Sequence, residues 1–372
     1  MSLAISSPPA PALLDLSAKL TELLRGWAAD TFAHGGYPRL EMQALADARL
    51  LTCTLPGGLL EGSASPTSDL LTTLYHIGRG NLSVGRIFEG HLNALLLIQC
   101  YGTPEQRRRW FADAENRHVF AVWNTEMADG VSFNREADGR IRVAGAKSFC
   151  SGSTEVSRPL VTGNARGESG LEAGWQLAVI PLDRHEPEVD TTFWTTVGMR
   201  NSVSYKIDFT GILLEADQLL GGPDDYNRQP FLTAGCLRFA AVQLGGAEAI
   251  LEETCAYLRS RGRTEAPDQR RRVGRMTVAL ETARLWLPRA GEVIDRGSDA
   301  GEIVFTANVV RTVVTEACRL VLRLSDECVG ARGMLPPQPL ARLHADLQVY
   351  LRQPAPDAAL DAVGQRTLDG LS

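Results

Sequence analysis

Apolar residues recur at helical spacing at both ends of the chain and alternate in short runs in its middle. From Leu13 to about Phe111, leucines return every three or four residues, the period of a helix with one buried face. The same period resumes at Phe231 and is then sustained. The apolar stripes there predict four helices, over 231–258, 273–294, 304–324 and 340–351. Long helices with short connections are typical of an antiparallel four-helix bundle.

The middle of the chain has a different pattern. Between residues 117 and 222, short runs rich in Val, Ile, Thr and Trp alternate with Gly, Asn and Asp, as in a small antiparallel barrel or sandwich. Phe120–Trp123 is predicted to be a buried strand, and Asp138-Gly139 predicts a hairpin turn. We therefore expect an α+β chain of three domains: an N-terminal helical domain (1–116), a β-domain (117–222) and a C-terminal four-helix bundle (223–372).

Composition excludes several classes of protein. With 372 residues, 44% hydrophobic and 22% charged, the chain has the composition of a soluble globular protein. A net charge of −6 disfavours nucleic acid or an anionic membrane as partner. The seven cysteines include no C-x-x-C pair, which favours reduced thiols and a cytoplasmic location. We read no signal peptide and no apolar run near the roughly 20 residues that span a bilayer.

One stretch carries candidate chemistry. In the segment 120–152, Thr125 and Ser151 stand at the ends of predicted strands, and Phe149 lies close to the second. Two hydroxyl groups and an aromatic face suit a flat heterocycle with polar edges, because the ring can stack on the aromatic side chain while the hydroxyls bond its heteroatoms. No Rossmann fingerprint, P-loop, catalytic triad or metal-spaced cluster competes with this stretch, and His91 is expected to be a packed helix residue.

The same stretch resembles the acyl-CoA dehydrogenase family. Thr125-Glu126 and Gly130 are similar to its T-E-P-x-x-G-S segment, and 145–151 to its G-x-K-x-W-I-T segment. Further segments resemble the family in the same order, at 102–106, 198–222 and 327–333. The resemblance covers nearly the whole chain and implies an FAD flavoprotein, with Thr125, Gly130, Phe149 and Ser151 near the flavin.

In this family FAD lies between subunits, so the resemblance also implies residues that act across an interface. Arg261 stands where the family has an Arg that pairs with the pyrophosphate, and Glu327 and Gly330 belong to a segment similar to its Gln-x-x-Gly-Gly-x-Gly. By this resemblance we expect self-association to a dimer or tetramer, a small-molecule substrate such as an acyl-CoA thioester, and an electron-transfer partner.

A catalytic base is missing from the positions where this family carries it. Dehydrogenation of a thioester needs a carboxylate to remove the α-proton. The usual family Glu aligns with Pro354-Ala355-Pro356, and the less common position, just before Arg238, is Leu237. Substitutes could be Asp357, Asp361 or Glu126, which are expected instead to be surface or cap residues, so the catalytic residue is unknown.

Three functions remain open at this point. The leading hypothesis is an FAD-dependent oxidoreductase that dehydrogenates an acyl thioester or a similar substrate. The alternative is a flavin-dependent monooxygenase on the same fold, whose chemistry with O2 needs no α-proton base. The third is a binding or scaffold protein that has lost catalysis.

Overall fold

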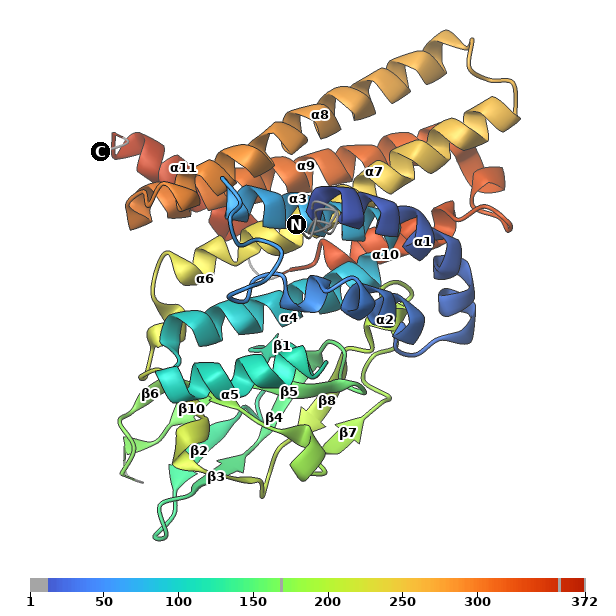
Figure 1. Cartoon of the computed structure of the whole chain (residues 1–372). Coiled ribbons are helices and arrows are strands. Elements are labelled where there is room, and N and C mark those ends of the chain that lie inside the picture. The colour runs from blue at the N-terminus through green and yellow to red at the C-terminus, as the bar shows by residue number, and fades with distance from the viewer. Residues whose placement is uncertain (1–12, 168–169, 354–355, 371–372) are drawn as a thin grey trace, which may run out of the picture.

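The structure, a computed structural model, describes residues 13–167, 170–353 and 356–370 and shows helices on one side and strands on the other (Figure 1). The N-terminal helices are α1 (Leu13–His34), α2 (Arg39–Asp47), α3 (Pro66–Gly80), α4 (Leu82–Tyr101) and α5 (Pro104–Glu115). The C-terminal helices are α6 (Phe231–Ala234), α7 (Cys236–Ser260), α8 (Pro267–Asp295), α9 (Ala300–Gly333), α10 (Leu340–Tyr350) and α11 (Pro356–Leu368). The predicted order of helices, strands and helices is confirmed.

Between these two sets lie the strands. They are β1 (Val119–Trp123), β2 (Ser132–Arg135), β3 (Ile141–Ala144), β4 (Ala146–Cys150), β5 (Val156–Ala165), β6 (Gly174–Val179), β7 (Glu188–Asp190), β8 (Tyr205–Asp208), β9 (Leu213–Leu214) and β10 (Leu219–Leu220). Short 3₁₀ helices connect other segments: η1 (Leu50–Thr52), η3 (Leu182–Arg184), η4 (Arg200–Ser202), η5 (Ala216–Gln218) and η6 (Asp225–Asn227).

The helices from both ends of the chain share one apolar core. Helix α3 packs against α7 and α8, and α9 lies against α7 and α8 as well. The contact between α3 and α7 depends on glycine, since a Cβ at Gly245 would lie 2.1 Å from the Tyr75 carbonyl oxygen and one at Gly78 only 2.3 Å from that of Val242. An N-terminal helix is thus built into the C-terminal bundle, while the proposed domain boundaries stay a prediction.

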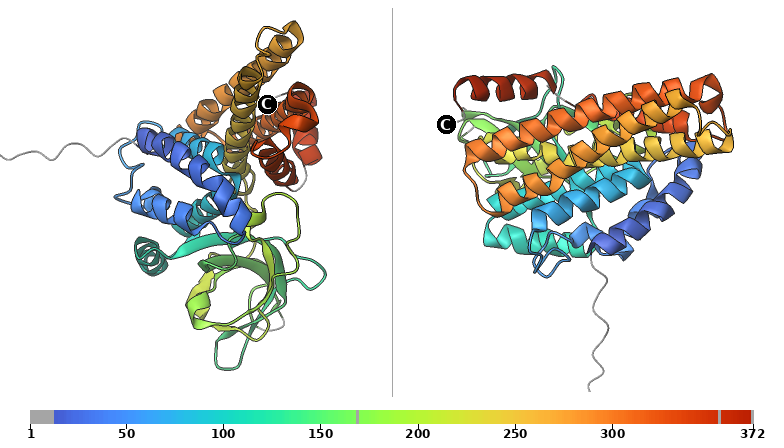
Figure 2. Two further views of the ribbon diagram at one scale, coloured as in Figure 1. Left: turned by 90° about the vertical axis from the view of Figure 1, so that its right-hand side faces the viewer. Right: turned by 90° about the horizontal axis from the view of Figure 1, so that it is seen from above.

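The β region forms two sheets on one side of the helices (Figure 2). The larger sheet has the order β10-β6-β5-β2-β3-β9, with β1 also paired to β5, and the smaller has the order β4-β8-β7. Most pairs are antiparallel, as predicted, but β5 pairs in parallel with β1 and β2. The predicted hairpin at Asp138-Gly139 joins β2 and β3. Apolar residues of both sheets pack together in one core, which includes Phe133 and Ile207.

Helix α4 connects the two halves of the molecule, because it packs on β1 as well as on α7. His91 lies in this contact with no exposed surface; its Nδ1 accepts from the Phe120 amide (3.0 Å) and its Nε2 donates to the Leu51 carbonyl oxygen (2.7 Å). Burial lowers the pKa of His91 to about 4, so the ring is neutral. The prediction of a packed helix residue is confirmed.

One described segment, Phe231–Ser260, is long and apolar enough to span a bilayer by length and composition. In the fold, 72% of its most apolar window is buried, as expected for a core helix of a globular protein. Arg238 lies within this segment, so its apolar residues do not form one uninterrupted run. The cytoplasmic location stays a prediction.

Candidate active site

A cavity of about 1060 Å³ lies where the β region meets α4, α7 and α10. Phe149 and Ser151 line it from the strand side, and Glu89 and Arg238 from the helix side. Thr125 also lines it. The three residues that were predicted to hold a flat heterocycle are therefore brought to one cavity, which has the size of a ligand site.

Phe149 presents its ring to this cavity because the backbone is bent locally. The register between β4 and β8 shifts between Lys147 and Cys150, and Phe149 adopts a φ of +57°, which is uncommon for a residue with a Cβ. The side chain is 47% exposed, and its ring makes T-shaped contacts with Phe193 and Trp194, at ring centroid distances of 5.1 and 6.1 Å. Exposed aromatic surface is thus available to a planar ligand.

The loop that carries Thr125 is held by a fully buried lysine. Lys147 donates to the Asn124 carbonyl oxygen (3.0 Å) and to the Glu126 carboxylate (2.5 Å), and it has no exposed surface. The Ser148 amide also donates to the Thr125 carbonyl oxygen at 2.9 Å. Burial lowers the pKa of Lys147, and the Glu126 carboxylate opposes that shift. Thr125 is therefore fixed from both sides, with its side chain left to the cavity.

Ser151 is the last member of a chain of three buried hydroxyls. Ser202 Oγ donates to the Met199 carbonyl oxygen (2.7 Å), and 2.8 Å contacts join Ser202 to Ser204 and Ser204 to Ser151. Each hydroxyl has one proton. Because the Ser202 proton is already used, Ser204 must donate to Ser202, and Ser151 must donate to Ser204. Ser151 Oγ therefore offers lone pairs, and no proton, to the cavity.

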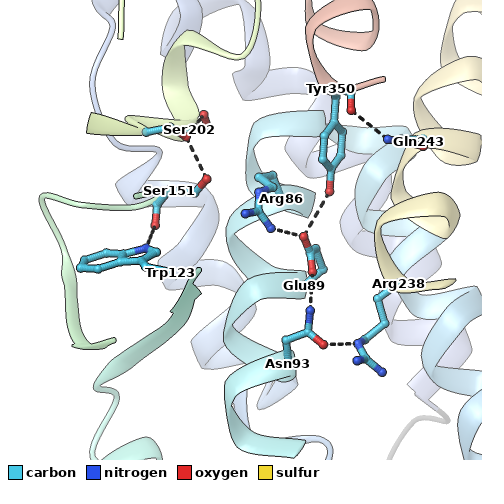
Figure 3. Close-up of polar contacts among 10 residues, drawn as sticks. Arg86, Glu89, Asn93, Trp123, Ser151, Ser202, Arg238, Gln243 and Tyr350 are labelled. Atoms are coloured by element: carbon cyan, nitrogen blue, oxygen red, sulfur yellow. Dashed lines mark hydrogen bonds and ion pairs between the residues drawn. The ribbon is translucent and has the colours of Figure 1, made fainter. Parts of the chain in front are cut away.

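The opposite wall carries a polar network that connects three helices (Figure 3). The Glu89 carboxylate accepts from Arg86, from Asn93 Nδ2 (3.1 Å) and from the Tyr350 hydroxyl (3.5 Å). Asn93 Oδ1 in turn accepts from Arg238 Nε at 2.5 Å. Burial, reinforced by the Glu89 charge, raises the pKa of Tyr350 well above its usual value, so the phenol keeps its proton.

The loop between β7 and β8 is fixed to α10 by a buried carboxylate. Asp346 on α10 accepts from the Met199 amide at 2.6 Å, and Met199 has a φ of +55°. Burial raises the pKa of Asp346 to about 6, and the Met199 hydrogen bond and the Arg342 charge oppose that shift. Met199 also carries the carbonyl group at which the serine chain ends, so this contact positions the strand side of the cavity.

The other predicted site residues do not line the cavity. Gly130 packs against Glu126, whose Cδ would lie 2.3 Å from an added Cβ, so glycine is needed there for packing. Arg261 ends α7 and faces the Tyr257 ring, and Glu327 is ion-paired with arginines on the outer surface of α8 and α9. Gly330, with a φ of +58°, makes a kink in α9. A role for the last three across a subunit interface stays a prediction.

No proposed substitute base reaches the cavity. Leu237 is 2% exposed in the apolar core, and Asp357 and Asp361 are exposed on α11. Glu126 is bound to Lys147 and to the Val131 amide. Pro354 and Ala355 lie outside the described residues. Among the described residues, Glu89 is the carboxylate that lines this cavity.

Sequence reasoning missed Arg86, Glu89, Asn93, Arg238 and Tyr350. Three of them were detectable, since Arg86, Glu89 and Asn93 recur at three- and four-residue spacing within an otherwise apolar helix and so share one face. The contacts of these residues with Arg238 on α7 and Tyr350 on α10 could not be predicted from the sequence, because they join segments that are far apart in the chain.

Comparison with known proteins agrees with this architecture. Residues 228–351 match the family described as acyl-CoA dehydrogenase, C-terminal domain. Dibenzothiophene monooxygenase of Rhodococcus qingshengii is 26% identical over 94% of this chain and 92% of that protein. Dibenzothiophene monooxygenase TdsC of Paenibacillus sp. A11-2, solved with FMN and indole, has a TM-score of 0.86 at 25% identity, over 96% of this chain and 97% of that one.

A dehydrogenase has the same fold. Butyryl-CoA dehydrogenase of Megasphaera elsdenii has a TM-score of 0.85 at 16% identity, over 99% of this chain and all of that one. The chain thus has the fold of the acyl-CoA dehydrogenases and of the flavin-dependent monooxygenases built like them, and its residues 228–351 match the acyl-CoA dehydrogenase C-terminal domain.

Proposed function

We propose that this protein is a flavin-dependent monooxygenase that uses reduced FMN. The proposal rests on the hydrogen bonds and the ion pair that Glu89 makes in the cavity wall. Both of its carboxylate oxygens accept hydrogen bonds, and one of the donors is the Arg86 guanidinium. An ion-paired carboxylate is a poor acceptor for the α-proton of a thioester, because protonation would leave the buried guanidinium without its counter-charge. Monooxygenation needs no such base.

The direction of the serine chain supports reduced flavin as the bound form. Ser151 Oγ can only accept a hydrogen bond from a ligand in the cavity. Reduced isoalloxazine has an N5–H donor that the oxidised ring lacks, so an accepting hydroxyl at the ring edge favours the reduced form. Phe149 would stack on the ring, and Thr125 would bond its polar edge.

We propose FMN rather than FAD as the flavin. Arg261, Glu327 and Gly330, which the family resemblance assigns to FAD bound across a subunit interface, do not line the cavity of this chain. Glu327 is already neutralised by Arg272 and Arg323, which hold its pKa below the usual value. FMN has no adenylate that would need a second site. The relative TdsC supports this choice, because its structure holds FMN.

When bound, the flavin would supply two electrons to O2, so that one oxygen atom enters the substrate and the other leaves as water. Phe149 and the hydroxyls of Thr125 and Ser151 would hold the ring.

The test uses purified protein with FMN, NADH, a flavin reductase and ¹⁸O2. Dibenzothiophene and indole are suitable first substrates, since relatives are named for them or were solved with them. We expect one ¹⁸O atom in the product, measured by mass spectrometry. In parallel, butyryl-CoA is added anaerobically to protein with oxidised flavin, where no bleaching is expected. Bleaching by the thioester, with no oxygen incorporation into any substrate, would restore the dehydrogenase hypothesis.

A further inference from the structure

Arginines outnumber carboxylates among the described residues that line the cavity. Among the described residues, the charged groups there are the guanidinium groups of Arg86, Arg238, Arg311 and Arg352 and a single carboxylate, Glu89. Glu89 is paired with Arg86. Excess positive charge in a partly buried cavity favours ligands with negative charge, because the surrounding low dielectric strengthens the attraction.

Arg238 is oriented by the network on α4. Asn93 stands between Glu89 and Arg238, and only one orientation of its amide serves both, since a carboxylate can only accept and a guanidinium can only donate. The amide nitrogen must face Glu89, and the amide oxygen must face Arg238 Nε. The anion Glu89 thus positions the cation Arg238 without pairing with it.

The terminal nitrogens of Arg238 remain available to a ligand. Within the described residues its hydrogen bond is the one from Nε to Asn93, and no carboxylate pairs with it. Burial on α7 lowers the pKa of Arg238, and the Glu89 charge opposes the shift. A half-buried guanidinium without a carboxylate partner is stabilised by an anion that it can bind through two parallel hydrogen bonds.

We propose that Arg238 forms an oxyanion subsite, which binds a carboxylate, sulfinate or sulfonate group of the substrate. This inference rests on the proposed function, in which Phe149 and Ser151 on the strand side of the same cavity hold the flavin. A substrate anchored on α7 by its oxyanion can extend its apolar part toward the strand side. Asn93 is then a positioning residue, because it acts through Arg238.

The experiment measures binding to the protein loaded with oxidised FMN, by isothermal titration calorimetry. Benzoate, benzenesulfinate and benzenesulfonate are compared with neutral benzamide, which has a similar ring. We expect at least one of the anions to bind about 10- to 100-fold more tightly than benzamide, as charge-assisted bidentate hydrogen bonds allow. The anion that binds best identifies the oxyanion class. Equal affinity for the anions and benzamide would overturn the proposal.

Substitutions test whether Arg238 is the residue that binds the anion. Arg238→Met should bring the affinity for the preferred anion down to the level of benzamide and leave the affinity for FMN within about twofold. Asn93→Leu should weaken anion binding less, because the guanidinium is present but no longer oriented. Arg319→Met is the matched control, since Arg319 is exposed and pairs with Glu316. Loss of FMN affinity in Arg238→Met, with the anion preference retained, would instead assign Arg238 to the flavin phosphate.

The two proposals fail in different ways. Anion binding that depends on Arg238, without any ¹⁸O incorporation, would support the subsite and contradict the monooxygenase. The opposite result is ¹⁸O incorporation into neutral substrates at the same rate in wild type and Arg238→Met, with no preference for anions. It would support the monooxygenase and contradict the subsite.

Discussion

The two walls of the cavity are built in different ways. The strand side comes from two short stretches of sequence around Thr125 and Ser151, joined by backbone hydrogen bonds such as that from Ser148 to Thr125. The helix side comes from α4, α7 and α10, and the contact of Arg238 with Asn93 joins residues 145 positions apart. The candidate ring contacts thus come from two neighbouring stretches of sequence, whereas the contact that orients Arg238 forms only after the chain has folded.

This difference has a functional counterpart. Three hydroxyls and an aromatic ring form a neutral surface, which suits an uncharged planar ring. The opposite wall has a paired carboxylate and an oriented guanidinium, which suit a charged substrate group. We propose that cofactor and substrate are recognised by separate halves of the fold.

The largest effect is expected on the helix wall. Glu89→Ala leaves Arg86, whose side chain is only 23% exposed, without its carboxylate. Removal of one partner of a buried ion pair costs about 3 kcal/mol of unfolding free energy. Denaturant titration measures it. Glu105→Ala is the matched control, because Glu105 and Arg108 are also three residues apart on a helix but are exposed, and little change is expected there. Equal stability of the two variants would show that the network is not structural.

Asp346, at the junction of the two walls, should make stability depend on pH. Burial raises its pKa from the usual 3.8 to about 6, so the folded state binds the extra proton between these pH values. Stability contributed by this group is therefore fully present below about pH 4, falls as the pH rises to about 6, and is constant above it. The shift from 3.8 to about 6 corresponds to about 3 kcal/mol.

Asp346→Asn should remove that slope while keeping an acceptor for the Met199 amide. Chemical denaturation at pH 4.5 and pH 7 measures the effect, and the variant should gain stability relative to wild type as the pH rises. An unchanged difference between the two proteins at both pH values would contradict the assignment.

The aromatic contact on the strand wall should matter for flavin binding. Phe149→Ala removes the exposed stacking surface and should weaken FMN binding about 10-fold, since stacking of a heterocycle on an aromatic side chain contributes about 1–3 kcal/mol. Quenching of FMN fluorescence on titration measures it. Phe149→Trp keeps the surface and should bind FMN nearly as wild type does. If both variants bind FMN equally well, the ring does not stack on residue 149.

The smallest effect concerns the direction of the serine chain. In Ser204→Ala the Ser151 proton loses its acceptor and can turn into the cavity, where oxidised flavin can accept it. The preference for reduced over oxidised FMN should fall about 2- to 10-fold, the range of one hydrogen bond. Dissociation constants of both forms, measured anaerobically, give the ratio. Ser153→Ala is the control, because Ser153 donates to Val203 in the same turn but lies outside the chain. A ratio that does not move in Ser204→Ala would refute the proton order.

Most of the fold could be predicted from the sequence, but only part of the site could. The hydrophobic periods located both helical regions and the β region, but missed α11, a short helix with one buried residue, Ala359, and so a weak apolar stripe. Ser68-Asp69 is typical of a helix cap and predicts a helix start there, but α3 begins at Pro66. Thr103 before Pro104 predicts another cap, and Thr103 does cap α5, with a reciprocal bond from Gln106.

The sequence by itself determined where helices and strands form and which stretch presents Thr125, Phe149 and Ser151, because period, turn residues and short motifs are local properties. Only the tertiary structure decided that the Tyr350 hydroxyl donates to Glu89 and that Asn93 orients Arg238 at the cavity. The physical reason is that the reactivity of a charged group depends on its burial and on its partners in space, and packing of α4 against α7 and α10 sets both.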